Sequence, residues 1–522
     1  PGRRTGGAQA EAQGQAEGRE IQAEIQTDAR AGARRTGRLP EGEGRVPGKT
    51  PGPAGAEVTR RERSAVVRLL AGRTQRWHAA CRFGCGLCCL LMCFRGGFTM
   101  IAYKGDILYT PTPDRFEVFE DGYVLVENGK VVQVSGSLPS EYADVEVIDR
   151  SGRLIIPGFN DLHIHAPQYP LAGLGFDYEL LPWLENYTFK TEAKYADLDV
   201  ADHWYRLFVT KLWQVGTLRF SAFATLHNES TLRLMQLCQE SGLRPVVGKV
   251  NMDRNSPADL VESTEESLRG AQDLIERSKT LTPDIGFIVT PRFVPSTTPE
   301  LMTGLGELVE RYQLPVQSHL DENRSEVEWV RQLHPDIPSY AEVYEHYGLM
   351  PENRTIMAHC IWLSEREKAL LKDRGVWLAH CAQSNLDLTS GIMPARRNLE
   401  YGLKLSIASD VAGGHEPSMN RNIVMAIEAS KAKTFEAGYA GDRPLTLPEA
   451  FHMATKAGGS FFGKVGSFEP GYEFDALVVR EGESLLDLSV EERLERFIYM
   501  GDDRDIEERY VAGRLINRPF QH

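Results

Sequence analysis

The chain of 522 residues has few of the features that mark secreted or membrane-spanning proteins. Beyond residue 99 it holds only three cysteines, Cys238, Cys360 and Cys381, which are too few and too scattered for a disulfide framework. No window approaches 18 uninterrupted apolar residues, so no transmembrane helix is expected. We therefore expect a soluble, cytoplasmic protein that does not bind membranes.

Basic charge is also scarce in the body of the chain. Residues 100–522 hold 42 basic and 64 acidic residues, whereas residues 1–99 hold 17 basic and 9 acidic ones. Because an acidic body repels a polyanion, nucleic acid is not an expected partner. The chain is 42% hydrophobic, which is enough to bury a sizeable core and excludes a wholly disordered protein.

The first 99 residues differ in composition from the rest. They repeat Gly, Ala, Gln and Arg without a sustained period and include the cysteine-rich stretch CRFGCGLCC. A basic nucleic-acid arm, a metal loop and a targeting segment are possible functions, but the stretch lacks a second Cys/His pair at zinc-finger spacing. We interpret residues 1–99 as a mostly disordered, appended or mistranslated leader before a natural start at Met100.

The body of the chain shows the pattern of an α/β protein. After Pro157, eight apolar strand-like runs alternate with helical stretches, which is typical of a parallel sheet. The runs lie in LIIPGFNDLHIH, GTLRFSAFA, RPVVGKV, IGFIVTP, PVQSHL, RTIMAH, VWLAHC and KLSIASD. Eight such strands within roughly 250 residues predict a (β/α)₈ TIM-type barrel.

Shorter β segments flank this predicted barrel. Between residues 101 and 156 alternating segments recur, and the Asn128-Gly129 pair predicts a hairpin turn between YVLVE and VVQVS. Near the other end, LTLPEAFHMATKAGGSFFG predicts a helix ended by Gly, and FDALVVR and RYVAGRLINR predict strands. We expect one small β-sandwich built from residues 100–157 and 461–522, with the barrel over residues 158–460.

Four of the predicted strands end in side chains that can bind a metal ion. These are His163 and His165 on the first strand, His319 on the fifth, His359 on the sixth and Asp410 on the eighth. Barrel enzymes place their chemistry at the C-terminal ends of their strands, and two histidines two residues apart on a strand point to the same side. Imidazoles and a carboxylate around one divalent ion suit zinc best, with iron or manganese as substitutes.

Such a site predicts hydrolysis. A bound divalent ion lowers the pKa of water from about 15.7 toward about 7, which makes hydroxide available at neutral pH. Asp410 can bind the ion and accept the proton of the water, and Glu322, three residues past His319, is a candidate general acid/base. His380, at the end of the seventh strand, is expected to pack in the core or to shape the site.

Several motifs in combination resemble a known family. PGFNDLHIHAPQY, TPRF, QSHLDENRSEVE, MAHC, LAHCAQSNLDLTSG and SDVAGG resemble the amidohydrolase superfamily of metal-dependent hydrolases and, within it, the guanine deaminases. TPRF and the Gln three residues after HxH separate the guanine deaminases from the wider superfamily. The resemblance implies a homodimer with one zinc ion per subunit that converts guanine and water to xanthine and ammonia.

The resemblance also implies roles for individual residues. By motif position the metal ligands are His163, His165, His319 and Asp410. His359 matches a histidine that contacts the metal-bound water or the substrate, and Glu322 matches the proton shuttle. The purine-recognition residues match Gln168, Arg292 and Phe293, with His165 and His319 beside them.

The chain departs from the usual family pattern at three motifs. It has HAPQY for ASQY, HCAQSN for HCPNSN and IASD for a GTD-like run, so Pro167 and Gln383 could alter the preference among purines. Two alternatives stay open. One is an amidohydrolase that deaminates or dechlorinates another heterocycle, of the 8-oxoguanine, cytosine or triazine type, and the other is a catalytically silent barrel scaffold. A catalytically silent scaffold would be expected to have lost metal ligands, whereas this chain keeps them.

Overall fold

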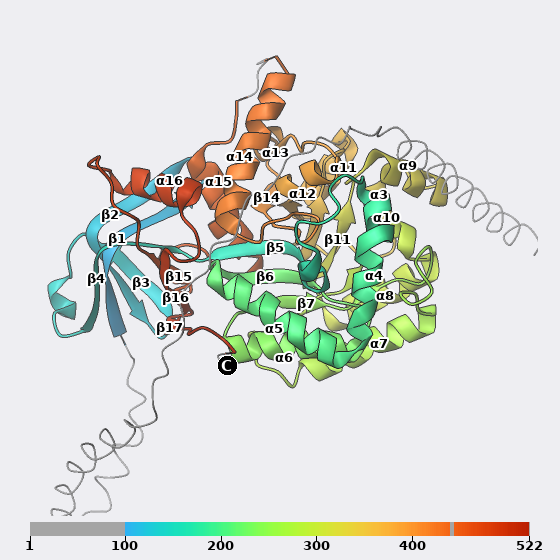
Figure 1. The fold of residues 1–522 in the computed structure, drawn as a ribbon, viewed down its shortest axis with the longest axis horizontal. Helices are drawn as coiled ribbons and strands as arrows, with labels where there is room; N and C mark the ends of the chain where they lie inside the picture. The colour runs from blue at the N-terminus through green and yellow to red at the C-terminus, as the bar shows by residue number, and fades with distance from the viewer. Residues whose placement is uncertain (1–99, 439–442, 521–522) are drawn as a thin grey trace, which may run out of the picture. The chain divides into compact units, whose positions relative to one another are not determined.

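The computed structural model describes residues 100–438 and 443–520, so the predictions made for residues 1–99 lie outside the described part of the chain. The described residues contain one large, mostly antiparallel sheet and a second region in which parallel strands alternate with helices (Figure 1). The predicted α/β class is therefore confirmed. Within the described residues, no helix combines the length and apolar character needed to cross a bilayer.

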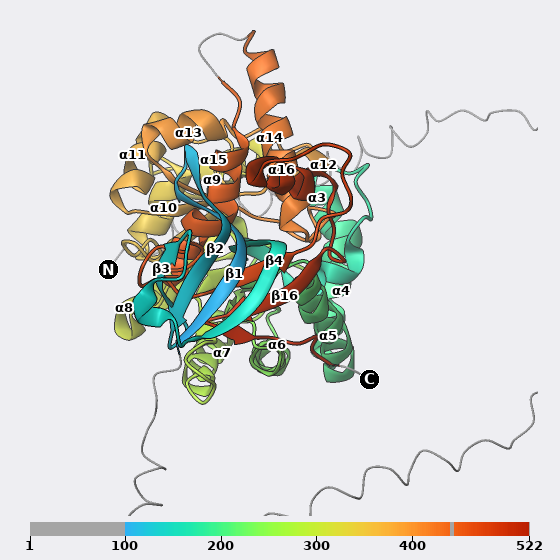
Figure 2. The ribbon, with the colours of Figure 1, turned by 90° about the vertical axis from the view of Figure 1, so that its left-hand side faces the viewer.

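The large sheet joins strands from both ends of the described chain. Its seven strands follow the order β17-β16-β15-β4-β1-β2-β3. Their bounds are β1 Met100–Thr112, β2 Arg115–Glu127, β3 Lys130–Ser135, β4 Glu146–Pro157, β15 Ala476–Val479, β16 Ile506–Val511 and β17 Arg514–Leu515. Because β15 pairs with β4, the N-terminal and C-terminal segments share one hydrogen-bonded sheet, whose broad face is seen in Figure 2.

The turn between β2 and β3 is the predicted hairpin. Asn128 and Gly129 have φ values of 52° and 78°, which an Asn-Gly pair adopts at low cost. A side chain at Gly129 would also collide with the carbonyl of Ala512, so only glycine fits here.

The first predicted barrel strand is divided in the structure. LIIP belongs to β4 of the large sheet, and β5, Phe159–His165, begins the parallel region, so the prediction of one continuous strand was wrong. The division falls at Gly158, whose N–H donates to the carbonyl of Asp475. A Cβ atom at Gly158 would overlap the side chain of Leu218, so the chain changes sheets where a close approach requires glycine.

All eight predicted strand positions of the parallel region hold strands. They form the four-stranded sheets β5-β6-β7-β9 and β11-β12-β13-β14 and the pair β10-β8. The remaining bounds are β6 Thr217–Phe223, β7 Val246–Gly248, β8 Val250–Asn251, β9 Gly286–Phe287, β10 Thr290–Pro291, β11 Val316–Leu320, β12 Thr355–His359, β13 Trp377–His380 and β14 Lys404–Ile407. The third and fourth predicted strands are each present as two short pieces.

Two seams lie between the four-stranded sheets. At one seam, Val289 forms an isolated parallel bridge with Val316. At the other, the N–H of Asp410 donates to the carbonyl of His163, and the N–H of His165 donates to the carbonyl of Val411. Backbone hydrogen bonds therefore connect the two sheets on both sides.

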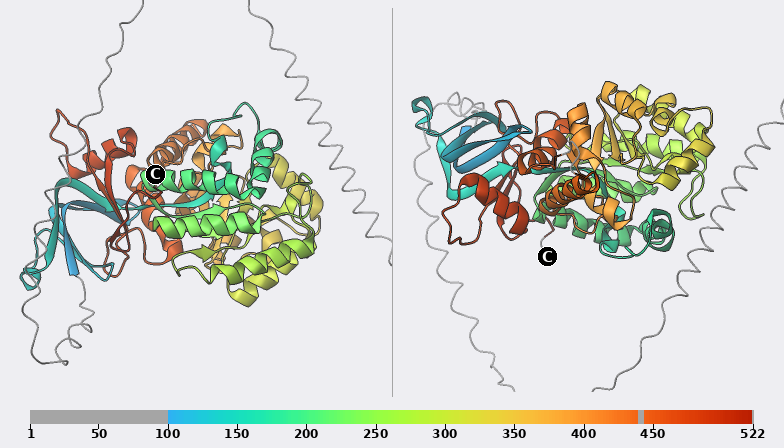
Figure 3. Two further views of the ribbon diagram at one scale, coloured as in Figure 1. Left: turned by 60° about the horizontal axis from the view of Figure 1, so that its bottom comes forward. Right: turned by 90° about the horizontal axis from the view of Figure 1, so that it is seen from above.

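Helices pack around the parallel strands. The longer ones are α5 Leu198–Gln214, α6 Asn228–Ser241, α7 Thr264–Ser278, α8 Pro299–Tyr312, α9 Arg324–Leu333, α11 Glu365–Asp373 and α14 Met419–Glu436. Helix α16, Val490–Met500, packs instead against α14 and against β1, β2 and β4 of the large sheet. The shorter ones are α3 Leu180–Trp183, α4 Phe189–Glu192, α10 Tyr340–His346, α12 Ala382–Asp387, α13 Ala395–Tyr401 and α15 Leu447–His452. Neighbouring green helices run side by side along the strands in Figure 3.

The sequence of α5 shows why these helices pack on the strands. Its buried residues recur at helical spacing and face the core, namely Ala201, Tyr205, Phe208, Val209 and Leu212. The predicted helix near residue 450 is also present. It begins as α15, continues through short helical turns to Phe462, and ends at Gly463 with a φ of 111°.

Candidate active site

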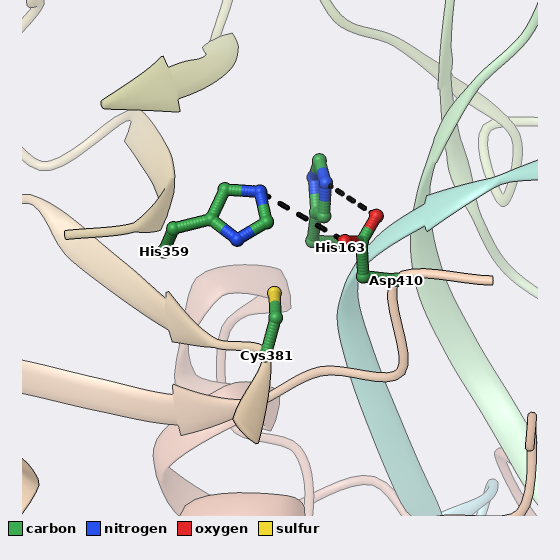
Figure 4. A group of neighbouring side chains, drawn as sticks. All are labelled: His163, His359, Cys381 and Asp410. Carbon is green, nitrogen blue, oxygen red and sulfur yellow. Dashed lines mark ion pairs between the residues drawn. The ribbon is translucent and has the colours of Figure 1, made fainter. Parts of the chain in front are cut away.

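The metal-competent side chains converge at the C-terminal ends of the parallel strands. Figure 4 shows three of them, His163, His359 and Asp410, together with Cys381. His163 and His165 end β5, His319 lies on β11, His359 ends β12, and Asp410 follows β14 by three residues. We call these five residues the histidine cluster. Potential ligand atoms lie within 4.8 Å of one another in two overlapping groups: His163, His165 and His319, and His163, His359, Cys381 and Asp410.

Distances within the histidine cluster fit a bound cation. The Nε2 atom of His163 lies 3.1 Å from Oδ1 of Asp410, and the Nε2 atoms of His165 and His319 are 3.1 Å apart. Two imidazole lone pairs this close repel unless a proton or a cation lies between them. Both ring nitrogens of His163 are buried without a hydrogen-bond partner among the described residues, although buried polar groups normally have one. The donor set therefore fits a divalent cation.

Burial sets the protonation of the cluster. It lowers the pKa of His163, and it lowers the pKa of His165 and His319 well below 6.5. Burial alone would raise the pKa of Asp410, but the nearby imidazoles, His163 foremost, outweigh it and hold that pKa below 3.8. Neutral imidazoles and an ionised carboxylate are the forms that bind a metal ion.

Two hydrogen bonds orient the rings of the cluster. The Nδ1 atom of His319 donates to the backbone carbonyl of Arg292 at 2.6 Å, and Nδ1 of His359 donates to Oδ1 of Asn385 at 2.9 Å. In the neutral rings this leaves the Nε2 atoms of both histidines with a free lone pair. The Nε2 atom of His359 lies 3.5 Å from Oε2 of Glu322 and 3.9 Å from Oδ2 of Asp410.

Glu322 lies beside the cluster, two residues after β11. It is buried, and burial raises its pKa well above 4.5, with the charges of Glu326 and Asp410 adding to the effect. Its Oε1 accepts a hydrogen bond from Ser390 at 3.3 Å, and its N–H donates to Glu326 at 3.0 Å. Burial therefore favours the protonated form of Glu322, next to the imidazole of His359.

A second group, which we call the arginine cluster, consists of Gln168, Glu192 and Arg292. Arg292 directly follows β10, Gln168 lies in a helical turn just after β5, and Glu192 ends α4. Arg292 donates from Nη1 and Nη2 to the two carboxylate oxygens of Glu192, at 2.6 and 3.1 Å. Gln168 donates from Nε2 to Oε1 of the same carboxylate at 2.8 Å. All three side chains are buried.

The two clusters face one cavity. Its polar lining comes from His165, His319, His359, Asp410, Glu322, Gln168 and Arg292, and its apolar lining includes Leu180, Trp183, Leu184, Phe293 and Leu388. Phe293 also makes an edge contact with Trp329, with ring centroids 6.3 Å apart. The structure thus brings every predicted site residue except His163 to the cavity wall, and His163 lies directly behind, against Asp410.

The backbone is unusual at the same place. Asp321, His359, Cys360 and Asp410 have φ values between 49° and 69°, in the left-handed region that residues other than glycine rarely adopt. Such conformations cluster at functional sites, where the surrounding structure holds them.

Other residues singled out in the sequence lie near the site without joining the cavity wall. His380 ends β13 outside both ligand groups, and burial lowers its pKa to about 4. Cys381 falls within one group, but its Sγ donates to the carbonyl of Ala379, and burial raises its pKa well above 9. A thiol in this state is a poor metal ligand. Gln383 accepts the N–H of Glu416 at 2.8 Å and braces the loop after β14.

Sequence reasoning missed Glu192, Asn385 and Ser390. Asn385 and Ser390 lie within the quoted LAHCAQSNLDLTSG motif, so their neighbourhood was visible in the sequence although their contacts were not. Glu192 ends a helix of four residues and follows no strand, so neither periodicity nor strand-end position indicates it.

Comparison with known proteins agrees with this geometry. The model of the family described as "Amidohydrolase family" matches residues 154–516, which is more than half of the chain. The chain therefore belongs to the amidohydrolase family.

Several curated relatives that match at 34–36% identity are guanine deaminases. The chain is 36% identical to the guanine deaminase of Dictyostelium discoideum, over 79% of this chain and 97% of the relative. It is 34% identical to the guanine deaminase of Homo sapiens, over 79% of this chain and 96% of the relative. A crystal structure of guanine deaminase from C. acetobutylicum with bound guanine has 47% identity and a TM-score of 0.78, covering 80% of this chain and all of that one.

More distant structures share the fold alone. A triazine hydrolase from Arthrobacter aurescens superposes with a TM-score of 0.69 at 18% identity, covering 80% of this chain and 94% of that one. The fold by itself therefore does not distinguish between substrates.

Proposed function

We propose that the protein hydrolyses guanine to xanthine and ammonia, with one zinc ion held by His163, His165, His319 and Asp410. The observation that carries this proposal is that members of both clusters line the same cavity: His165, His319, His359 and Asp410 of the histidine cluster, and Gln168 and Arg292 of the arginine cluster. The histidine cluster offers the donor set of a catalytic metal, and the arginine cluster offers directional hydrogen bonds to a planar heterocycle. The similarity to guanine deaminases supports guanine as that heterocycle.

The bound zinc ion would supply Lewis acidity that makes water nucleophilic at neutral pH. Asp410, held ionised, accepts a proton from the attacking water, and Glu322 carries a proton to the departing nitrogen. The water oxygen forms a bond to the amine-bearing ring carbon, and the carbon–nitrogen bond breaks to release ammonia. His359, between Glu322 and Asp410, lies within reach of both carboxylates.

Purine binding is assigned to the other side of the cavity. Arg292 and Gln168 provide hydrogen bonds to the edge of the ring, and Phe293 provides an apolar contact. His165 and His319 also line the cavity and are assigned contacts with the substrate. Leu180, Trp183 and Leu184 contribute to the apolar lining.

The two alternatives are less well supported. A different heterocycle would need another set of recognition residues, whereas the named relatives that match at 34–36% identity are guanine deaminases. A silent scaffold would not need to keep a buried set of donors around unpaired imidazole nitrogens.

The finer features of the fold are part of the proposal. We propose that the parallel strands close into a (β/α)₈ barrel over residues 158–460, which the backbone hydrogen bonds at both seams support. Residues 100–157 and 461–522 would form the second domain, of β-sandwich type, which the pairing of β4 with β15 supports. A homodimer in the cytoplasm stays a prediction from the family resemblance, to be tested by light scattering and cell fractionation.

The proposed function is tested with purified protein and a set of bases. Absorbance assays with guanine, adenine, cytosine and 8-oxoguanine should show preferential turnover of guanine, with xanthine as the product. Metal analysis of the same preparation should give one zinc ion per chain. Finding iron or manganese instead would identify the metal that takes the place of zinc. Inactivity of the fully metallated protein toward guanine would overturn the proposal.

A further inference from the structure

Glu192 has no part in the hydrolytic scheme, yet it is one of the most enclosed carboxylates of the cavity region. Its exposed fraction is 2%. It accepts three hydrogen bonds from the two polar side chains that line the recognition side of the cavity, two from Arg292 and one from Gln168. A single carboxylate thus holds both of these side chains at once.

The ion pair fixes the direction and the charge of Arg292. A guanidinium has five N–H donors in a planar fork, and two of them point at Glu192. The remaining donors keep a fixed orientation, and the face of the guanidinium lies 5.3 Å from the ring of Phe189. Because both charged groups are buried, Glu192 also cancels a positive charge that would otherwise favour an anionic ligand.

Glu192 also decides which way the Gln168 amide faces. The Nε2 atom donates to Glu192, while Oε1 accepts the N–H of Ala412 at 3.4 Å. One donor and one acceptor therefore remain, in a fixed order, for a ligand in the cavity. Without the carboxylate, only the long hydrogen bond from the N–H of Ala412 opposes a half-turn of the amide, which would exchange donor and acceptor.

We propose that Glu192 is a positioning residue that orients Arg292 and Gln168 and makes the recognition side of the cavity selective for a neutral purine over an anionic one. This inference rests on the proposed guanine deaminase function. It predicts that Glu192 acts on substrate binding through its two partners rather than on the chemical step.

The test compares Glu192→Gln, Glu192→Asp and the matched control Glu179→Gln, which changes an exposed carboxylate beside α3. For Glu192→Gln we expect the KM for guanine to rise at least about tenfold, since charged hydrogen bonds are lost, while kcat changes less than about threefold. Glu192→Asp keeps the charge and should lie between wild type and Glu192→Gln. Inhibition by xanthine in mildly alkaline buffer, where xanthine is an anion, should strengthen in Glu192→Gln.

A double substitution shows whether the effect passes through Arg292. In an Arg292→Ala background, Glu192→Gln should raise KM clearly less than it does in the wild-type background, because only the contact with Gln168 remains to be lost. A full additional tenfold rise, or an unchanged KM in Glu192→Gln alone, would overturn the inference. If Glu192→Gln does not fold, the same KM comparison is made with Glu192→Asp, measured alone and in the Arg292→Ala background. The same outcomes then support or overturn the inference.

The wild-type assay separates the two proposals. Absence of guanine turnover by metallated wild type would overturn the proposed function. Normal wild-type turnover together with an unaffected Glu192→Gln would overturn only the role of Glu192.

Discussion

The histidine cluster and the arginine cluster face the same cavity but are held in place in different ways. The histidines lie on parallel strands or at their ends, where the backbone hydrogen bonds of the sheet fix their positions. The arginine cluster draws on three connecting segments and is held mainly by contacts between its own side chains. Under the proposed function, the contrast implies that the chemical step depends on residues anchored to the sheet and substrate recognition on a side-chain network. Substitutions in the two clusters should therefore affect different kinetic constants.

His163→Ala is expected to have the largest effect. Apart from the approach of Nε2 to Asp410, the ring nitrogens of His163 have no hydrogen-bond partner among the described residues, so the substitution removes a proposed metal donor from the cluster. We expect zinc to fall to background and guanine turnover to fall on the order of 1,000-fold or more. Metal analysis and steady-state kinetics measure this. His380→Ala, at the end of a nearby strand and outside both ligand groups, should keep its zinc. Full zinc occupancy in His163→Ala would contradict the assignment.

The second largest effect is expected for Glu322→Gln, which should separate proton transfer from metal binding. We expect kcat to fall at least about 100-fold with zinc retained. Because burial raises the pKa of Glu322, its ionisation should appear in the wild-type pH profile above pH 4.5 and be missing from the variant. Glu328→Gln, an exposed change on α9, serves as the control. Loss of zinc from Glu322→Gln would show that this carboxylate is a ligand instead.

Arg292→Ala should disrupt the arginine cluster and leave the histidine cluster intact. The side chain is lost, but the backbone carbonyl that accepts the hydrogen bond of His319 remains, so zinc should stay bound. We expect the KM for guanine to rise about 10- to 100-fold, with a smaller change in kcat. The control is Arg366→Ala, which removes one side of a surface ion pair with Glu342 elsewhere in the molecule. Unchanged guanine kinetics would remove Arg292 from the recognition site.

The smallest effect is expected for Asn385→Ala, which sharpens the comparison within the histidine cluster. Asn385 accepts the Nδ1–H of His359 and so sets the direction of that ring. Loss of such an orienting contact should lower kcat about tenfold while zinc remains. Asn385→Asp keeps an acceptor and should retain more activity than Asn385→Ala. Equal loss in both variants would show that the hydrogen bond to His359 is not what matters.

The strand positions and the histidine cluster could be predicted from the sequence for one physical reason. Parallel strands read as short apolar runs, and their carboxyl ends meet at one edge, so the residue at the end of each run is also the residue at the site. His163, His319 and His359 follow this rule, and Asp410 departs from it only by lying three residues beyond β14.

The features that sequence reasoning missed depend on contacts between distant segments. A continuous apolar run does not show that it changes sheets at Gly158, because β4 pairs with β15, which is distant in sequence, whereas β5 pairs with β6. Glu192 is recognisable only through its contacts with Gln168 and Arg292, which are distant in sequence. Helix α16 was also missed, although Ser489 and Glu492 form a capping box that marks its start.

The place of β15 between β4 and β16 has a consequence for biosynthesis. While the chain grows on the ribosome, β4 is made early, but the strand that covers its open edge is translated only after the whole parallel region. Until then β4 presents unpaired amides and carbonyls, which can template association with other chains. The nascent protein should therefore depend on chaperones until β15 has left the exit tunnel and paired with β4.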